Sequence, residues 1–257
     1  MRYPETRQRA RLLSLAWLPL LLGYALPAGP AVTPGVSAGA SADLSADARS
    51  ALHAISGHVG ELSDPEALAV AFEAYYRYRA ENSRLVRKPY LYFVDLGLDG
   101  RTPRGYVFDM GRLEVVDGPF TVAHGSGSSV SRDAVPTVFS NAPGSHASSL
   151  GLYLAQETYT FHGSAGGRGY QSVGLRLKGE SGRFNNAARA RGIVVHGAPY
   201  VTLTSAGRSE GCPAMEPERA RRLLPLLANG GIVFVYSPRD PRWLSEGPWV
   251  VGRSGSL

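Results

Sequence analysis

Residues 191–214 of this 257-residue chain read RGIVVHGAPYVTLTSAGRSEGCPA, and they decide what kind of domain it forms. The β-branched run Ile193-Val194-Val195 predicts a buried strand that ends at His196. A glycine-rich turn region follows, and Cys212, the only cysteine in the sequence, then stands directly before a predicted helix. A histidine at a strand end that faces a turn with a cysteine is an arrangement suited to nucleophilic catalysis on a β-rich frame.

The remaining sequence indicates a mainly β, α+β fold. Thirty-one glycines and 18 prolines favour many turns and short strands over long helices. A helix is predicted over 217–228, where leucines recur on one face before Asn229-Gly230-Gly231 ends it. Apolar runs broken by turn residues predict strands at 90–96, 105–110, 113–116, 121–124, 150–153, 173–177, 193–196 and 232–236.

Helical patterns precede the first predicted strand. One helix is expected to open around 43–47, and a second near Ser63-Asp64-Pro65-Glu66, where Ser63 or Asp64 can cap the N-terminus. The apolar stripe of the second helix is expected to pack against the following domain. We therefore expect a helical N-terminal appendage at 43–85, a catalytic domain at 88–240 and a C-terminal tail at 241–257.

The first forty residues predict a secretory signal peptide and linker. An apolar run from Leu12 to Leu26 is too short to span a bilayer comfortably, and small residues with A-x-A character follow it. The alternative is an uncleaved N-terminal anchor. In both cases the domain is exported to the periplasm or cell envelope, and cleavage would leave no stable membrane insertion. The positive region before the apolar run consists of Arg2, Arg7, Arg9 and Arg11.

The charge pattern excludes one class of partner. The formal net charge is +6, and it falls to +3 without the charged residues of the first forty. A mild positive balance is compatible with an anionic cell-wall polymer. The sequence has no run of Lys and Arg and no basic stripe interleaved with aromatic residues, so nucleic acid is not expected as a partner.

The lone cysteine suggests a catalytic site. An exported protein with one cysteine cannot form an internal disulfide, so the thiol is either a small buried hydrophobe or a functional group. Histidine at 196 and the helix start after 212 would both lower the pKa of the Cys212 thiol. The N–H groups of Gly211 and Cys212 are candidates for stabilising an oxyanion. Ser209 is expected to hydrogen-bond either the His196 imidazole or a neighbouring carbonyl.

Together these residues resemble the YkuD-like murein L,D-transpeptidase catalytic domain, in its branch with H-G-A and S-x-G-C-P-A motifs. The resemblance implies a β-sandwich-like catalytic fold and a ping-pong reaction on peptidoglycan stem peptides, which serve as donor and acceptor. It also implies that His196 takes the Cys212 proton and that the thiolate attacks the carbonyl of an L-centre followed by a D-residue. The matching segments are 122–127, 139–141, 148–151, 191–198 and 207–214.

The resemblance does not decide which type of cross-link the enzyme forms. The commonest family motif has Arg or Asn two residues after the cysteine, whereas Ala214 stands there in this chain. Both 3→3 and 1→3 linkage therefore remain, since a stem contains an L,D bond after its first residue as well as after its third. Water in place of an acceptor amine would make the enzyme an L,D-carboxypeptidase or endopeptidase. The residues expected to contact substrate are Gly197, His124, His146 and Ser149, with a structural histidine as the alternative for His124.

Three rival interpretations of these residues require different patterns. His124, His162, His196 and Cys212 lack the close pair of ligands typical of a zinc site, so neither a metal nor another cofactor is expected. A sortase-like transpeptidase would need a different sequence around the cysteine. A wall-binding protein that has kept the fold without catalysis is the remaining alternative, and the thiol's reactivity would distinguish it.

Overall fold

The computed structural model describes residues 44–250. The predicted signal peptide and linker at 1–40 and the last seven residues of the predicted tail lie outside the described residues. Among the residues that are described, no helix has the length and apolar character needed to cross a membrane. Eight strands form one mixed sheet and helices precede it, so the predicted mainly β, α+β class is confirmed.

The main sheet has the strand order β3-β2-β1-β10-β5-β6-β7-β9. The pairs β1–β10 and β7–β9 are parallel, and the other neighbours are antiparallel. A second sheet pairs the short strands β4 and β8 in parallel. The strands are β1 (Tyr90–Asp95), β2 (Gly105–Asp109), β3 (Glu114–Phe120), β4 (His124–Gly125), β5 (Gly151–Ala165), β6 (Arg168–Gly179), β7 (Val194–Gly197), β8 (Arg208–Ser209), β9 (Ala214–Met215) and β10 (Ile232–Tyr236).

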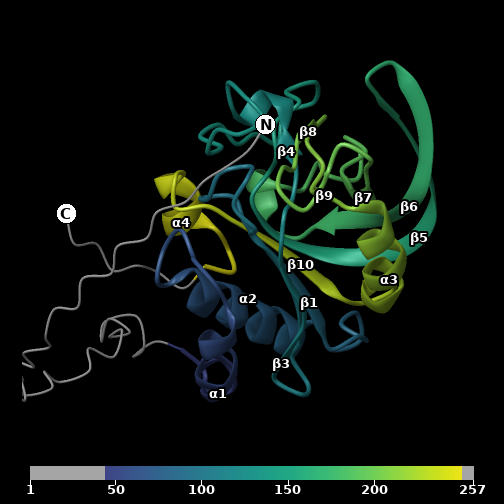
Figure 1. The fold of residues 1–257 in the computed structure, drawn as a ribbon. Coiled ribbons are helices and arrows are strands. Elements are labelled where there is room, and N and C mark those ends of the chain that lie inside the picture. Colours follow the sequence, from purple (N-terminus) through teal and green to yellow (C-terminus); the bar gives the residue numbers. More distant parts are fainter. Residues whose placement is uncertain (1–43, 251–257) are drawn as a thin grey trace, which may run out of the picture. The chain divides into compact units, whose positions relative to one another are not determined.

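The long hairpin β5–β6 extends and curves beyond the rest of the sheet (Figure 1). The expected strands at 150–153 and 173–177 were too short, because the outer half of this hairpin is polar and partly exposed and so lacks a continuous apolar run. The expected strand at 121–124 was wrong in its extent: only its last residue belongs to β4, while Ala123 forms an isolated bridge with Ala214.

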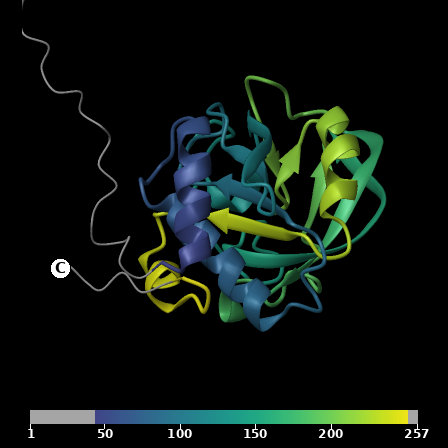
Figure 2. The same cartoon turned by 90° about the horizontal axis from the view of Figure 1, so that it is seen from below.

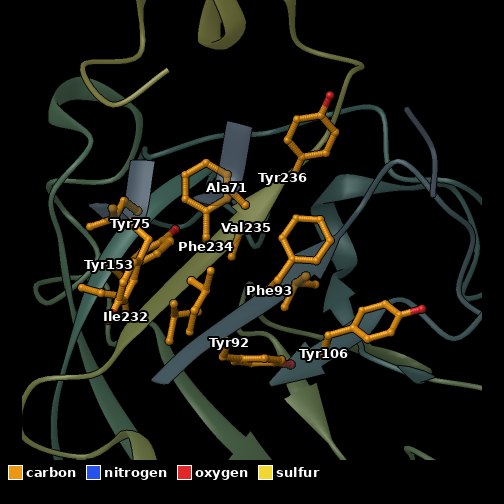
Figure 3. Close-up of a cluster of buried hydrophobic side chains, with 14 of the residues drawn as sticks. Ala71, Tyr75, Tyr92, Phe93, Tyr106, Tyr153, Ile232, Phe234, Val235 and Tyr236 are labelled. Carbon is orange, nitrogen blue, oxygen red and sulfur yellow. The ribbon is translucent and has the colours of Figure 1, made fainter. Parts of the chain in front are cut away.

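The core lies where β1, β2, β5 and β10 meet the second helix, α2 (Ala67–Glu81). Figure 3 shows aromatic and aliphatic side chains from these elements gathered in one cluster. Every residue of β10 is buried, as expected for a central strand that is covered on both faces. The labelled members are Ala71, Tyr75, Tyr92, Phe93, Tyr106, Tyr153, Ile232, Phe234, Val235 and Tyr236.

The N-terminal helices belong to the same compact unit as the sheet. Helix α1 (Ala46–Ile55) begins at the cap Ser45, whose side chain accepts a hydrogen bond from the Ala48 amide. Helix α2 contacts β1 and β10, and α1 contacts α2 and β3. Figures 1 and 2 both show α1 and α2 on the side of the domain away from β7 and from α3 (Pro217–Leu227). The elements that carry His196 and Cys212 are therefore not covered by these helices.

Helix α3 packs mainly on β6 and β7. It starts at Pro217, and the positive φ angles of Asn229 (62°) and Gly230 (129°) turn the chain into β10, as the sequence predicted.

The segment after residue 240 is more than the expected tail. Asp240 caps helix α4 (Pro241–Glu246), and its carboxylate accepts hydrogen bonds from the backbone amides of Arg242 and Trp243. Trp243 is fully buried against Phe234 and Tyr236 of β10. Burial of this large aromatic side chain fixes the helix on the core.

Candidate functional site

A tight turn carries Cys212 between the strands β8 and β9. The Ser209 hydroxyl accepts a hydrogen bond from the Gly211 amide at 3.2 Å and donates one to the Cys212 carbonyl at 2.6 Å. Of the two partners expected for Ser209, the structure thus shows a neighbouring carbonyl. The Gly211 amide, expected to help stabilise an oxyanion, is instead held by Ser209, which leaves the Cys212 amide as the candidate from this pair.

Strand β4 and the segment around Ser148 hold this turn in place. Gly125 of β4 pairs with Ser209, and the Ser148 hydroxyl accepts from the Gly125 amide at 2.9 Å and donates to the Gly211 carbonyl at 3.2 Å. Gly211 has φ of 119°, and a Cβ there would lie 3.0 Å from the Ala147 carbonyl oxygen. The turn therefore requires glycine at 211 both for its conformation and for its close packing.

The Cys212 thiol is buried, with 8% of the residue exposed. Its sulfur lies 3.9 Å from the Gly192 carbonyl oxygen. Burial raises the pKa of Cys212 to about 11, although a backbone hydrogen bond from Val194 and the charge of Arg191 lower this pKa, and Glu210 raises it further. In this state Cys212 is a neutral thiol near pH 7, and the low pKa expected from its position was wrong because desolvation outweighs the favourable charges.

His196 lies at the end of β7, in register with Ala214 of β9. Its Nδ1 is 3.1 Å from the Gly197 carbonyl oxygen, and its ring stacks on Phe161 at a centroid distance of 4.0 Å. A carbonyl only accepts, so we assign the ring proton to Nδ1, which leaves Nε2 as a proton acceptor. Burial lowers the pKa of His196 to about 4, so the imidazole is neutral at pH 7 and its Nε2 carries a free lone pair.

The sheet places His196 near the turn that carries Cys212, but the two side chains are not hydrogen-bonded to each other. His196 pairs with Ala214, two residues after the cysteine, in the parallel strands β7 and β9. Within residues 44–250 no hydrogen bond connects the thiol to the imidazole, since the sulfur contacts Gly192 and the imidazole contacts Gly197 and Tyr170. The pair is thus a neutral thiol in the turn before β9 and a neutral imidazole on the neighbouring strand β7.

The four expected substrate contacts occupy different surroundings. Gly197 is buried, and a Cβ there would lie 2.3 Å from the Ser172 hydroxyl. Ser149 is buried and its hydroxyl lies 2.8 Å from that of Tyr153. His146 is the exposed member, and its Nδ1 contacts the carboxylate of Glu210 in the nucleophile turn.

His124 has the position of a structural histidine. It is completely buried, with Nδ1 2.8 Å from the Arg104 guanidinium and Nε2 2.6 Å from the Ser129 hydroxyl. Burial and the charges of Arg104 and Arg208 lower the pKa of His124 to about 3. These contacts favour the structural alternative for this residue over contact with a substrate.

Sequence reasoning missed the aromatic and cationic groups around the thiol. Tyr170 places its hydroxyl 3.5 Å from His196 Nδ1. The charge of Arg191 acts on Cys212, and Tyr200 hydrogen-bonds Tyr170. Arg191 stands two residues before the predicted strand at 193–196. Because that strand ends at His196, a cation at its start is a usable signal for a charge near the thiol. Among residues 44–250, no group of three or more His, Cys, Asp or Glu side chains is arranged to hold a metal ion.

The family model for the L,D-transpeptidase catalytic domain matches residues 61–236, which is more than half of the chain and includes the whole site described above. The chain belongs to the L,D-transpeptidase catalytic domain family. It is thereby a member of a family of cysteine L,D-transpeptidases that acts on peptidoglycan. No curated protein matches it by sequence.

Solved structures that resemble this family member are distant. An L,D-transpeptidase from Mycobacterium smegmatis is 16% identical with a TM-score of 0.35, over 58% of each chain. One from Mycobacterium tuberculosis is 16% identical with a TM-score of 0.34, over 58% of this chain and 57% of its own. One from Stackebrandtia nassauensis is 13% identical with a TM-score of 0.34, over 76% of this chain and 92% of its own. The match thus spans little more than half the length of the two mycobacterial proteins.

Proposed function

We propose that this protein is an exported L,D-transpeptidase that forms peptidoglycan cross-links through a thioester on Cys212. The observation that carries the proposal is the neutral His196, whose Nδ1 is tied to the Gly197 carbonyl, on the strand next to the one that follows Cys212. Membership of the family and an expected leader peptide support it. The site of action is the periplasm or cell envelope, where peptidoglycan stems are the donor and acceptor.

In the acylation step the Cys212 sulfur forms a bond to the carbonyl carbon of the donor L-centre. The thiol proton passes to Nε2 of His196 as this bond forms. The oxyanion is stabilised by the Cys212 amide, since the Gly211 amide is held by Ser209. The bond from the carbonyl carbon to the D-residue nitrogen then breaks, and the leaving nitrogen takes the proton from His196.

In the second step an acceptor amine attacks the thioester carbon. Its proton passes to His196, the bond to sulfur breaks, and the Cys212 thiolate recovers a proton from the imidazolium. Transfer to an amine of a neighbouring stem gives a 3→3 or 1→3 cross-link, depending on which L-centre was the donor. Transfer to water gives L,D-carboxypeptidase or endopeptidase activity at the same bond.

Muropeptide analysis tests this proposal. Purified peptidoglycan is incubated with the wild type, Cys212→Ala and His196→Gln, digested, and examined by mass spectrometry. The matched control is His162→Gln, because His162 is exposed on the hairpin and contacts Gln171. We expect new dimers with the wild type and the control only, and their fragmentation identifies the donor L-centre.

The alternatives give different outcomes. Shortened stems without new dimers would show hydrolysis in place of cross-linking. The buried thiol with its raised pKa favours a second candidate, a peptidoglycan-binding protein without catalysis. Identical muropeptide profiles for the wild type and Cys212→Ala, together with co-sedimentation of both proteins with peptidoglycan, would establish that candidate and contradict the enzyme.

A further inference from the structure

Arg191 lies at the turn before β7 and binds a segment far away in sequence. Its Nη1 donates to the Ser140 carbonyl at 2.7 Å and to the Ser149 hydroxyl at 3.5 Å. Its Nη2 donates to the Ala147 carbonyl at 2.8 Å and to the Ser145 hydroxyl at 3.1 Å. Each Nη thus has two acceptors within the protein, so these N–H groups act on the chain itself.

The same side chain is next to the nucleophile turn. Arg191 Nη2 lies 3.5 Å from the position that a Cβ on Gly211 would occupy. The residue after Arg191, Gly192, presents the carbonyl that contacts the Cys212 sulfur. Arg191 therefore connects three parts of the site. They are the segment 140–149, the backbone at Gly192 beside the thiol, and the turn that carries Cys212.

We propose that Arg191 is the positioning residue of Cys212: it fixes the segment 140–149 against the nucleophile turn and places a positive charge beside the sulfur. The proposal rests on the function proposed above, in which this sulfur is the nucleophile. It assigns to one guanidinium a geometric role and an electrostatic role. The two roles separate experimentally, because lysine keeps the charge and loses the planar fork.

The charges near the thiol agree with this role. The charge of Arg191 lowers the pKa of Cys212, whereas that of Glu210 raises it. Burial lowers the pKa of Arg191, and as an arginine it stays charged at neutral pH. Arg191 thus partly offsets the cost of a negative sulfur in a buried site.

Chemical labelling of Cys212 measures the charge without any substrate. The wild type, Arg191→Met and Arg191→Lys are treated at pH 8 with iodoacetate, which is anionic, and with iodoacetamide, which is neutral and of similar size. The ratio of the two rate constants reports the local charge, because the thiolate fraction and the access of the reagents largely cancel. The matched control is Arg189→Met, whose wild-type side chain is exposed and hydrogen-bonds Gln156.

We expect the ratio of iodoacetate to iodoacetamide labelling to fall about fivefold in Arg191→Met, and to stay within about twofold of the wild type in Arg191→Lys and in the control. We expect kcat/KM for acyl transfer to fall about tenfold or more in both Arg191 variants, since lysine cannot replace the fork. A wild-type ratio in a folded Arg191→Met, or full acyl transfer in Arg191→Lys, would overturn the proposal.

Failure of the positioning role and failure of the proposed function give different results. If Arg191→Met does not fold, as judged by circular dichroism, Arg191→Lys decides: loss of acyl transfer with a wild-type ratio supports the positioning role, and unchanged acyl transfer refutes it. If the wild type performs no acyl transfer, the proposed function fails, while the labelling ratio still tests the effect of the Arg191 charge on Cys212.

Discussion

Removal of the Ser209 hydroxyl is expected to affect the nucleophile turn without affecting the base. In Ser209→Ala, the Gly211 amide and the Cys212 carbonyl both lose a buried hydrogen-bond partner. Each buried group left without a partner costs about 1–3 kcal/mol, and some relaxation of the turn reduces the sum. We therefore expect the free energy of unfolding to fall by about 2–3 kcal/mol.

The same change should slow acylation by roughly a hundredfold, because a displacement of the nucleophile by about 1 Å has an effect of that size. The acid limb of the pH profile should not move, since Ser209 contacts the Cys212 backbone and not His196. The assays are urea unfolding and the pH dependence of kcat/KM for a donor peptide. Ser172→Ala is the matched control, because the Ser172 hydroxyl is buried and has no hydrogen-bond partner within residues 44–250.

Two results would contradict this role of the Ser209 hydroxyl. A loss of stability no greater than that of the Ser172 control would mean that the two hydrogen bonds of Ser209 contribute nothing to the turn. A shift of the acid limb in Ser209→Ala would mean that this hydroxyl acts on the imidazole, which is the role that the structure does not give it.

Three further predictions concern the base, the buried network and the packing of the turn. Acylation should need neutral His196 and so fall only as pH drops toward about 4, whereas a limb near the ordinary value of 6.5 would contradict the lowered pKa of His196. Arg104→Met should lower the free energy of unfolding by about 3 kcal/mol in urea, because the Leu98 and Val122 carbonyls lose a buried donor; a loss under about 1 kcal/mol would argue against this network. Gly125→Ala places a Cβ 2.8 Å from the Gly211 Cα and should reduce kcat/KM about tenfold or more, while Gly57→Ala, which meets nothing within 4 Å, should leave kcat/KM unchanged; equal effects would refute the packing argument.

The sequence was a good guide where apolar periodicity is strong. The central strands around Phe93 and Phe234 and the helix at 217–228 were predicted nearly as they occur. Each of these elements has a buried face that determines its pattern of apolar residues. The family resemblance likewise depended on short local motifs, at 122–127, 139–141, 148–151, 191–198 and 207–214.

The hairpin β5–β6 was harder to predict because its outer half is stabilised by pairing and not by burial. His162 pairs with Gln171 and is exposed, and the turn between the strands has two glycines with positive φ. A polar segment with many glycines has no apolar alternation, so the sequence predicts only the short strands at 150–153 and 173–177. The aromatic residues on this hairpin, including Phe161 on His196, could not be placed without the register of its strands.

The electrostatics of the site depend on contacts that are distant in sequence. Whether Cys212 has a low or a raised pKa depends on how completely the surrounding segments remove water from its thiol. Arg191 contacts residues more than forty positions earlier in the chain, and His124 is buried by Arg104 and Ser129. Local spacing identified the residue types of the site, whereas their burial and partners required the tertiary structure.

The central claim, that Cys212 forms a thioester with the donor stem, is tested most directly by the mass of the intact protein. The wild type and Cys212→Ala are incubated with a stem peptide that contains the donor L,D bond and lacks an acceptor amine, and the reaction is stopped with acid. A thioester on Cys212 would give an adduct equal in mass to the donor without the residues after its L-centre, mapped to Cys212 and absent from the variant. An adduct of the same abundance in Cys212→Ala, or turnover of the peptide by that variant, would contradict it.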